Sequence, residues 1–132
     1  MLGQDRVTTV VDMEAGLEHL SRGTGRHVDT LLVVMEPYYK SLETARRCAV
    51  LGRELDIARV LGVANKLRGE DDTATVRRYA EAHGLHLVAE IPFDDSLYQA
   101  ELDGRAPALV PKSPAVRAID SLVSSLNFSE AS

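Results

Sequence analysis

The sequence predicts an α/β fold, a parallel sheet with helices on both of its faces. Short β-branched or apolar runs alternate with stretches of helical periodicity. The runs are continuously apolar rather than alternating, which is typical of strands buried on both faces. Alternation of strand and helix is typical of parallel sheets with crossover helices. The 132 residues correspond to a single domain, and we expect one α/β domain over residues 1–132.

Four strands are predicted, each followed by polar or turn-forming residues. They cover residues 7–11, 31–35, 60–64 and 85–91. The residues that end them are, in chain order, Asp12, Pro37, Asn65 and Pro92. Ligands bind beyond the carboxyl ends of strands in such sheets, so we expect these four places to meet at one edge.

Helical periodicity fills the segments between the strands. Residues 41–55 carry apolar side chains at three- and four-residue spacing, with Ser41 as the expected N-cap. Residues 72–83 form a second expected helix, and Gly84 stands where a C′ glycine belongs. Short helices are expected at residues 16–23 and 97–102.

The last helix is predicted to open at Ser113, a cap residue followed by Pro114 in the first turn. Its expected apolar face comprises Val116, Ile119, Leu122, Val123 and Leu126. This helix completes the covering of the predicted sheet.

Composition and charge exclude several classes of function. The net charge of −5 opposes nucleic-acid binding, and the single cysteine, Cys48, excludes an internal disulfide and an all-cysteine metal cage. Cys48 lies on an apolar helix face and is expected in the core, so no metal site is predicted. No apolar run is long enough to span a membrane, and no leader pattern opens the sequence, which favours a cytoplasmic protein.

Several arginines lie on the predicted helices and could line basic patches. They are Arg46, Arg47, Arg53, Arg77 and Arg78. Acidic residues stand at helical spacing beside them, including Glu43 four residues before Arg47. Salt-bridged, solvated helix faces are therefore the favoured interpretation.

An acidic pair and a glycine follow the first predicted strand. A carboxylate at Asp12 or Glu14 could hold a magnesium-bound water, and the Gly16 amide could reach a terminal phosphate. Acidic residues that suit the positive end of a helix dipole explain the same pattern. Both interpretations stay open on spacing alone.

The ends of the third and fourth strands carry groups that suit a planar base. The Asn65 side chain offers one acceptor and two donors, which match the edge of an adenine ring. Pro92 and Phe93 could form an apolar wall beside such a base. An Asx turn and a simple strand-ending turn are the alternatives.

Three segments resemble the MinD/ParA-like P-loop ATPases. Residues 10–23, with D-M-E-A-G and a following Glu-His pair, resemble their second-switch segment. Residues 62–66 (G-V-A-N-K) resemble the adenine-recognition strand end, and residues 89–94 (A-E-I-P-F-D) resemble the loop that covers adenine. The resemblance runs from about Val7 to Leu126. Within the class it points to the accessory ATPases that insert nickel into carbon monoxide dehydrogenase.

The resemblance implies ATP or ADP and Mg²⁺ as ligands, and it implies roles for particular residues. Asp12 would position the magnesium-bound water, Glu14 would belong to the mobile switch, and Gly16 would sense the γ-phosphate. The implied nucleotide-binding residues are Asn65 and Lys66 at the adenine, with Pro92 and Phe93 flanking the base.

The phosphate-binding motif of the family, G-K-G-G-x-G-K-[ST], does not occur in this chain, and neither does its C-x-C motif. The resemblance therefore implies a C-terminal part of a P-loop NTPase fold without the strand that carries the phosphate loop. That strand would lie between the first and second strands predicted here. Nucleotide binding by this chain alone is then expected to be weak or absent, and ATP hydrolysis negligible.

Three functions follow as hypotheses. The leading one is the C-terminal portion of an ATP-binding protein that serves maturation of carbon monoxide dehydrogenase, its client. The second is a degenerate, non-enzymatic relative that acts as a protein-interaction module. The third is a small flavodoxin-like or response-regulator-like domain. Since the absent strand leaves neighbouring strands unpaired, we expect either a homodimer or association with the missing N-terminal half.

Overall fold

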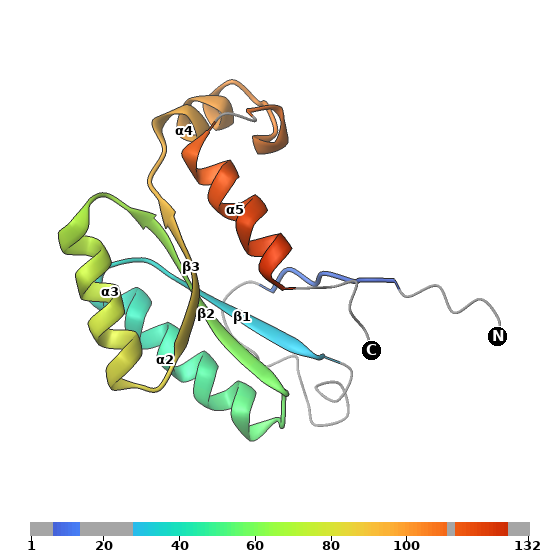
Figure 1. The fold of residues 1–132 in the computed structure, drawn as a ribbon, viewed down its shortest axis with the longest axis vertical. Coiled ribbons are helices and arrows are strands. Elements are labelled where there is room, and N and C mark those ends of the chain that lie inside the picture. Colours follow the sequence, from blue (N-terminus) through green and yellow to red (C-terminus); the bar gives the residue numbers. More distant parts are fainter. Residues whose placement is uncertain (1–6, 14–27, 111–112, 127–132) are drawn as a thin grey trace.

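The computed structural model describes residues 7–13, 28–110 and 113–126 (Figure 1). In chain order the elements are β1 (Thr30–Met35), α2 (Tyr39–Glu54), β2 (Arg59–Leu67), α3 (Glu70–Ala82), β3 (His86–Pro92), α4 (Asp95–Leu102), the short 3-10 helix η1 (Pro107–Leu109) and α5 (Pro114–Ser125). The three strands form one sheet in the order β1-β2-β3, and both pairings are parallel. The predicted α/β class is confirmed.

Helices cover both faces of the sheet, as predicted (Figure 1). On one face, Met35 of β1 and Ala64 of β2 pack in a core with residues of α2 and α3. On the other face, Val63 of β2 packs with Leu122 and Leu126 at α5. Neighbouring residues of a strand point to opposite faces, so β2 is buried from both sides. This double burial explains the continuous apolar run at residues 60–64 of β2.

The strand predicted over residues 7–11 is wrong. Residues 7–13 form neither helix nor strand, and Val7, Val10 and Val11 are 80%, 84% and 68% exposed. A β-branched run becomes a strand only when a neighbour pairs with it and buries its side chains. Within the described residues β1 pairs with β2 alone, so residues 7–11 have no strand beside them. The helix predicted over residues 16–23 lies outside the described residues.

Ser41 does not cap α2, contrary to prediction. The helix begins two residues earlier, at Tyr39, and its N-cap Tyr38 makes no side-chain cap hydrogen bond. The Ser41 hydroxyl instead accepts a hydrogen bond from the Glu36 amide at 2.8 Å. It therefore holds the turn that leads from β1 into α2.

The predicted C-terminal end of α3 and the predicted start of α5 are confirmed. Gly84 follows the C-cap of α3 with φ +64°, a left-handed conformation that glycine adopts without strain. The Ser113 hydroxyl accepts a hydrogen bond from the Val116 amide at 3.2 Å and caps α5, with Pro114 in the first turn.

The buried face of α5 differs from the predicted one. Leu122 and Leu126 are buried as expected, together with Ala115, whereas Ile119 and Val123 are 38% and 50% exposed. The helix packs mainly on β3, through the side that carries Ala115 and Leu122. Because the apolar stripe is wider than this contact, part of it faces solvent.

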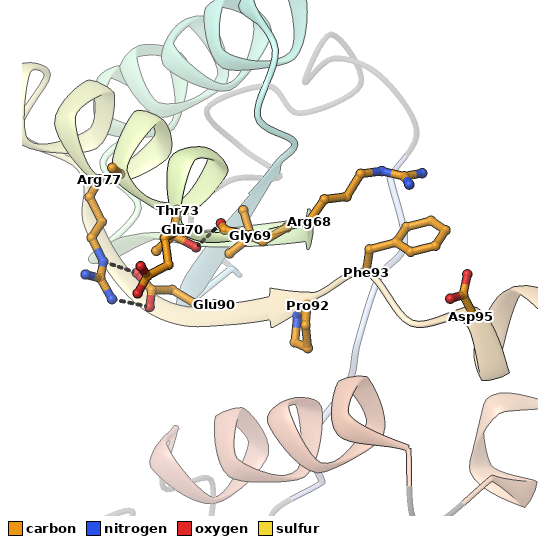
Figure 2. Close-up of a pocket in the computed structure, with 11 residues that line it drawn as sticks. Arg68, Gly69, Glu70, Thr73, Arg77, Glu90, Pro92, Phe93 and Asp95 are labelled. Carbon is orange, nitrogen blue, oxygen red and sulfur yellow. Dashed lines mark hydrogen bonds and ion pairs between the residues drawn. The ribbon is translucent and has the colours of Figure 1, made fainter.

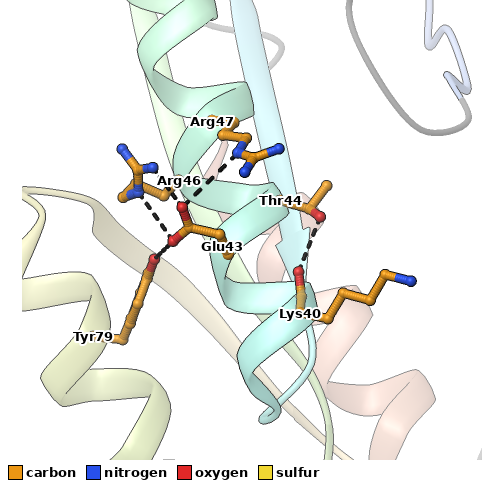
Figure 3. A network of polar contacts seen from close by, with 6 residues as sticks. All are labelled: Lys40, Glu43, Thr44, Arg46, Arg47 and Tyr79. Carbon is orange, nitrogen blue, oxygen red and sulfur yellow. Dashed lines mark hydrogen bonds and ion pairs between the residues drawn. The ribbon is translucent and has the colours of Figure 1, made fainter.

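A carboxylate joins α2 to α3 (Figure 3). Glu43 accepts hydrogen bonds from the Arg46 guanidinium, at 2.5 and 3.2 Å, and from the Tyr79 hydroxyl at 2.9 Å. The hydrogen bonds from Arg46 and then Tyr79 lower the pKa of Glu43 to about 2. Arg47, the expected partner, stands further away at 3.8 Å. The carboxylate is thus ionised and held between the two helices.

A second carboxylate, that of Asp94, joins the end of β3 to two helices. One oxygen accepts the Ser96 amide at 2.9 Å and caps α4. The other accepts the Ala115 amide at 3.0 Å and the Ser113 hydroxyl, both at the start of α5. The hydrogen bonds from Ser113, Ser96 and Ala115 hold the pKa of Asp94 far below its usual range.

Replacing Asp94 by alanine is expected to lower the free energy of unfolding by about 1–2 kcal/mol, because two helix starts lose an acceptor. The pKa of this carboxyl is depressed in the folded state, so its stabilisation is complete above its ordinary pKa of 3.8. The stabilisation then declines as the pH falls toward the lower, folded-state pKa. Urea denaturation between pH 7 and pH 2 measures both effects.

The neighbouring carboxylate provides the control for this experiment. Asp95→Ala removes an exposed acidic side chain at the first residue of α4 that accepts no such hydrogen bonds from the described residues, and it should leave stability nearly unchanged. Equal losses in the two variants, or the same acid dependence in Asp94→Ala and the wild type, would contradict the assigned role.

Candidate functional site

The carboxyl end of β2 is irregular where the nucleotide-binding residues were predicted. β2 runs on to Leu67, so Asn65 and Lys66 lie inside the strand rather than after it. Ala64 pairs with Glu90 and Leu67 with Pro92, so two residues of β2 stand opposite one of β3. This β-bulge gives Lys66 a left-handed φ of 56°. Bulges occur beside functional sites because they redirect side chains.

Asn65 is half-buried in this bulge. In the part of the chain that the structure describes, its side-chain amide has no hydrogen-bond partner. One acceptor and two donors therefore remain for a ligand. The neighbouring Lys66 is exposed, and its Nζ lies 4.0 Å from a carboxylate oxygen of Glu36 at the end of β1. The ends of β1 and β2 thus meet, as the parallel topology predicts.

An open groove of about 940 Å³ lies beside the ends of β2 and β3 (Figure 2). Its lining comes from the end of β2, the β2–α3 turn, α3, β3, the loop after β3 and the start of α4: Leu67, Arg68, Gly69, Glu70, Thr73, Ala74, Arg77, Glu90, Pro92, Phe93 and Asp95. The predicted residues Pro92 and Phe93 belong to this lining, whereas Asn65 and Lys66 do not.

Phe93 carries an aromatic ring at the mouth of the groove. Its amide donates a hydrogen bond to the Leu67 carbonyl at 2.8 Å, which ties the loop after β3 to the end of β2. The guanidinium of Arg68 lies over the Phe93 ring, with Cζ 3.8 Å from the ring centroid (Figure 2). Sequence reasoning missed Arg68, because residue spacing does not show that its side chain stacks on an aromatic ring 25 residues away in the chain.

A second arginine of the groove is neutralised. Arg77 donates two hydrogen bonds to the Glu90 carboxylate, one of them at 2.7 Å. These bonds raise the pKa of Arg77 and lower that of Glu90. Together with the Arg46–Glu43 pair, this contact favours the salt-bridged interpretation of the arginines over a basic patch.

The residues predicted to act on phosphates are placed differently. Asp12 is exposed in the irregular segment 7–13, and Glu14 and Gly16 lie outside the described residues. Across residues 7–13, 28–110 and 113–126, no cluster of three or more acidic, histidine or cysteine side chains could hold a metal ion. No helix in these ranges is long and apolar enough to cross a membrane.

Two relatives share most of this chain. An uncharacterized ATP-binding protein of Methanocaldococcus jannaschii is 37% identical over 105 residues, which are 80% of this chain and 40% of that protein. The carbon monoxide dehydrogenase accessory protein CooC of Rhodospirillum rubrum is 36% identical over 104 residues, 79% of this chain and 39% of that protein. The chain thus spans about two fifths of the length of these relatives. No family model matches the chain.

Solved structures share the fold. The cell division protein MinD of Aquifex aeolicus matches with a TM-score of 0.65 at 21% identity, over 79% of this chain and 45% of that chain. A ParA family ATPase of Chlorobium tepidum matches with a TM-score of 0.61 at 23% identity, over 80% and 43%. The flavodoxin-like alternative is thereby set aside. The comparisons therefore show that the chain is a homologue of ATP-binding proteins that include CooC, and that its fold is that of the MinD and ParA ATPases.

Proposed function

We propose that this chain is the C-terminal, base-binding part of a MinD/ParA-like ATP-binding protein. The observation that carries the proposal is that the end of β2, which bears Asn65, pairs with the end of β3, which Phe93 follows, in a chain whose relatives are ATP-binding proteins. Asn65 and Lys66 would read the edge of adenine, and Pro92 and Phe93 would flank its plane.

The described contacts suit a neutral, planar ligand. The hydrogen bond from the Phe93 amide to Leu67 sets the aromatic ring beside the end of β2, so the ring need not be ordered when the ligand arrives. The Asn65 amide supplies directional hydrogen bonds. An apolar plate with a few convergent polar groups is the usual composition of a small-molecule site.

The triphosphate would be handled by other groups. Asp12 would position a magnesium-bound water, Glu14 would belong to the switch, and Gly16 would contact the γ-phosphate. Mg²⁺, when bound, neutralises charge on the β- and γ-phosphates. Because the sequence holds no G-K-G-G-x-G-K-[ST] motif, we propose that this chain alone does not hydrolyse ATP.

Adenosine, ADP and ATP are expected to bind this chain with similar affinity, because the contacts proposed here go through the base. Asn65→Ala is expected to lower the affinity for adenosine about ten-fold, since two neutral hydrogen bonds of about 0.7 kcal/mol each are lost. Isothermal titration calorimetry with each ligand measures both effects.

Gln99→Ala is the matched control, because it removes an exposed amide of α4 that lies outside the groove lining. Affinity that rises steeply with the number of phosphates would refute binding through the base. Steady-state phosphate release in the ATP samples, abolished by Asp12→Ala, would refute the proposed lack of hydrolysis.

A role in nickel insertion is the finer proposal, supported by homology to CooC. Carbon monoxide dehydrogenase produced together with this chain should then contain more nickel than enzyme produced without it. Elemental analysis of the purified dehydrogenase provides the measurement. Equal nickel content with the chain, without it and with Asn65→Ala would contradict the role.

A role as an interaction module is the second candidate, favoured by the open edge of β1. Within the described residues β1 pairs with β2 alone, and its Val34 is 56% exposed. An open apolar edge strand is a template for pairing with another chain. Light scattering across a dilution series is expected to show a dimer that Val34→Lys dissociates.

Val50→Lys is the control for this assembly, because Val50 is an exposed valine on α2 rather than on the sheet. A monomer of 14.4 kDa at every concentration would show that the β1 edge does not recruit a second copy.

A further inference from the structure

The guanidinium of Arg68 occupies the face of the Phe93 ring at the mouth of the groove. Figure 2 shows Arg68 extending from the end of β2 toward the ring, and its Cζ lies 3.8 Å from the ring centroid. A guanidinium is flat and weakly hydrated, so it stacks on aromatic systems as well as forming ion pairs. The contact therefore joins two planar groups, both of which could face a planar ligand.

The backbone of this pair is fixed, whereas the arginine side chain is exposed. The Arg68 amide donates a hydrogen bond to the Asp72 carboxylate at 2.8 Å, and the Phe93 amide donates one to the Leu67 carbonyl. The side chain of Arg68 makes no ion pair with any described residue. The long side chain can therefore swing without disturbing either strand end.

Arg77 shows the contrast within the same groove. Its guanidinium is bound by the two oxygens of Glu90, so moving it would break two charge-assisted hydrogen bonds. Moving Arg68 breaks one stacking contact with a neutral ring. Of these two arginines, Arg68 is therefore the one available to a ligand.

We infer that Arg68 is a specificity residue for purines, which swings off Phe93 and closes over a base stacked on that ring. The inference rests on the proposed function and adds to it a residue and a selectivity. The guanidinium exchanges its contact with Phe93 for one with the base, while the base gains stacking on Phe93. A two-ring purine covers more of both planes than a pyrimidine does, so the sandwich favours purines.

Adenosine, cytidine and ATP titrations of the wild type, Arg68→Ala, Arg68→Lys and Phe93→Leu test the inference. Arg68→Ala should lower the affinity for adenosine about two- to five-fold. Phe93→Leu should lower this affinity about ten-fold. Both variants should reduce the preference for adenosine over cytidine. Arg68→Lys should bind adenosine more weakly than the wild type, because an ammonium group is not planar and does not stack on a base as a guanidinium does.

Arg77→Ala is the matched control, since it removes the same charge from the same groove but leaves the stack intact. It should keep the adenosine-to-cytidine ratio of the wild type. Thermal unfolding of every variant checks that exposed Arg68 can be replaced without loss of the fold.

The outcomes separate the inference from the proposed function. If the wild type and Arg68→Ala bind adenosine with equal affinity and equal selectivity, the role of Arg68 is refuted. Base binding itself is not refuted by that result. Loss confined to ATP in Arg68→Ala also overturns the role of Arg68, because that result assigns the arginine to phosphate. Wild type that binds no nucleoside overturns the base-binding function and the inference together.

Discussion

Parallel pairing of β2 with both of its neighbours is the constraint on which the structure depends. Val63 faces the α5 side and Ala64 the side of α2 and α3, so β2 contributes to both cores. Space on the strand is limited: a side chain at Gly62 would come within 3.0–3.1 Å of Leu87, Leu85 and Met35. The same pairing brings the carboxyl ends of all three strands to one edge, where the candidate site lies.

The loop after β3 links stability to the site. Phe93 lies in the groove, and the next residue, Asp94, fastens the starts of α4 and α5 through hydrogen bonds with Ser96, Ser113 and Ala115. The aromatic ring is therefore held between a backbone hydrogen bond to Leu67 and a capped helix junction. A ligand that stacks on Phe93 would contact a ring that is already in position, which reduces the entropy lost on binding.

Three carboxylates of the fold take part in structural contacts. Glu43 and Glu90 each neutralise an arginine, and Asp94 is committed to helix capping. The groups left for a ligand are the Asn65 amide, the Phe93 ring and the Arg68 guanidinium. The proposed base-binding function rests on these groups and on homology to ATP-binding proteins, which the chain matches over about two fifths of their length.

The sequence by itself determined the α/β class, the three described strands and the helices between them, because apolar runs and helical periodicity are local patterns. Local chemistry likewise sufficed for the Ser113 cap and the Gly84 C′ position, whereas the roles of Asn65 and Phe93 remain predictions. Tertiary structure alone decided that residues 7–11 do not form a strand, since a strand requires a partner that the sequence does not display. It also decided the bulge at Asn65 and Lys66, the buried side of α5, and the stacking of Arg68 on Phe93. Each of these depends on contacts between segments distant in the chain, which residue spacing does not encode.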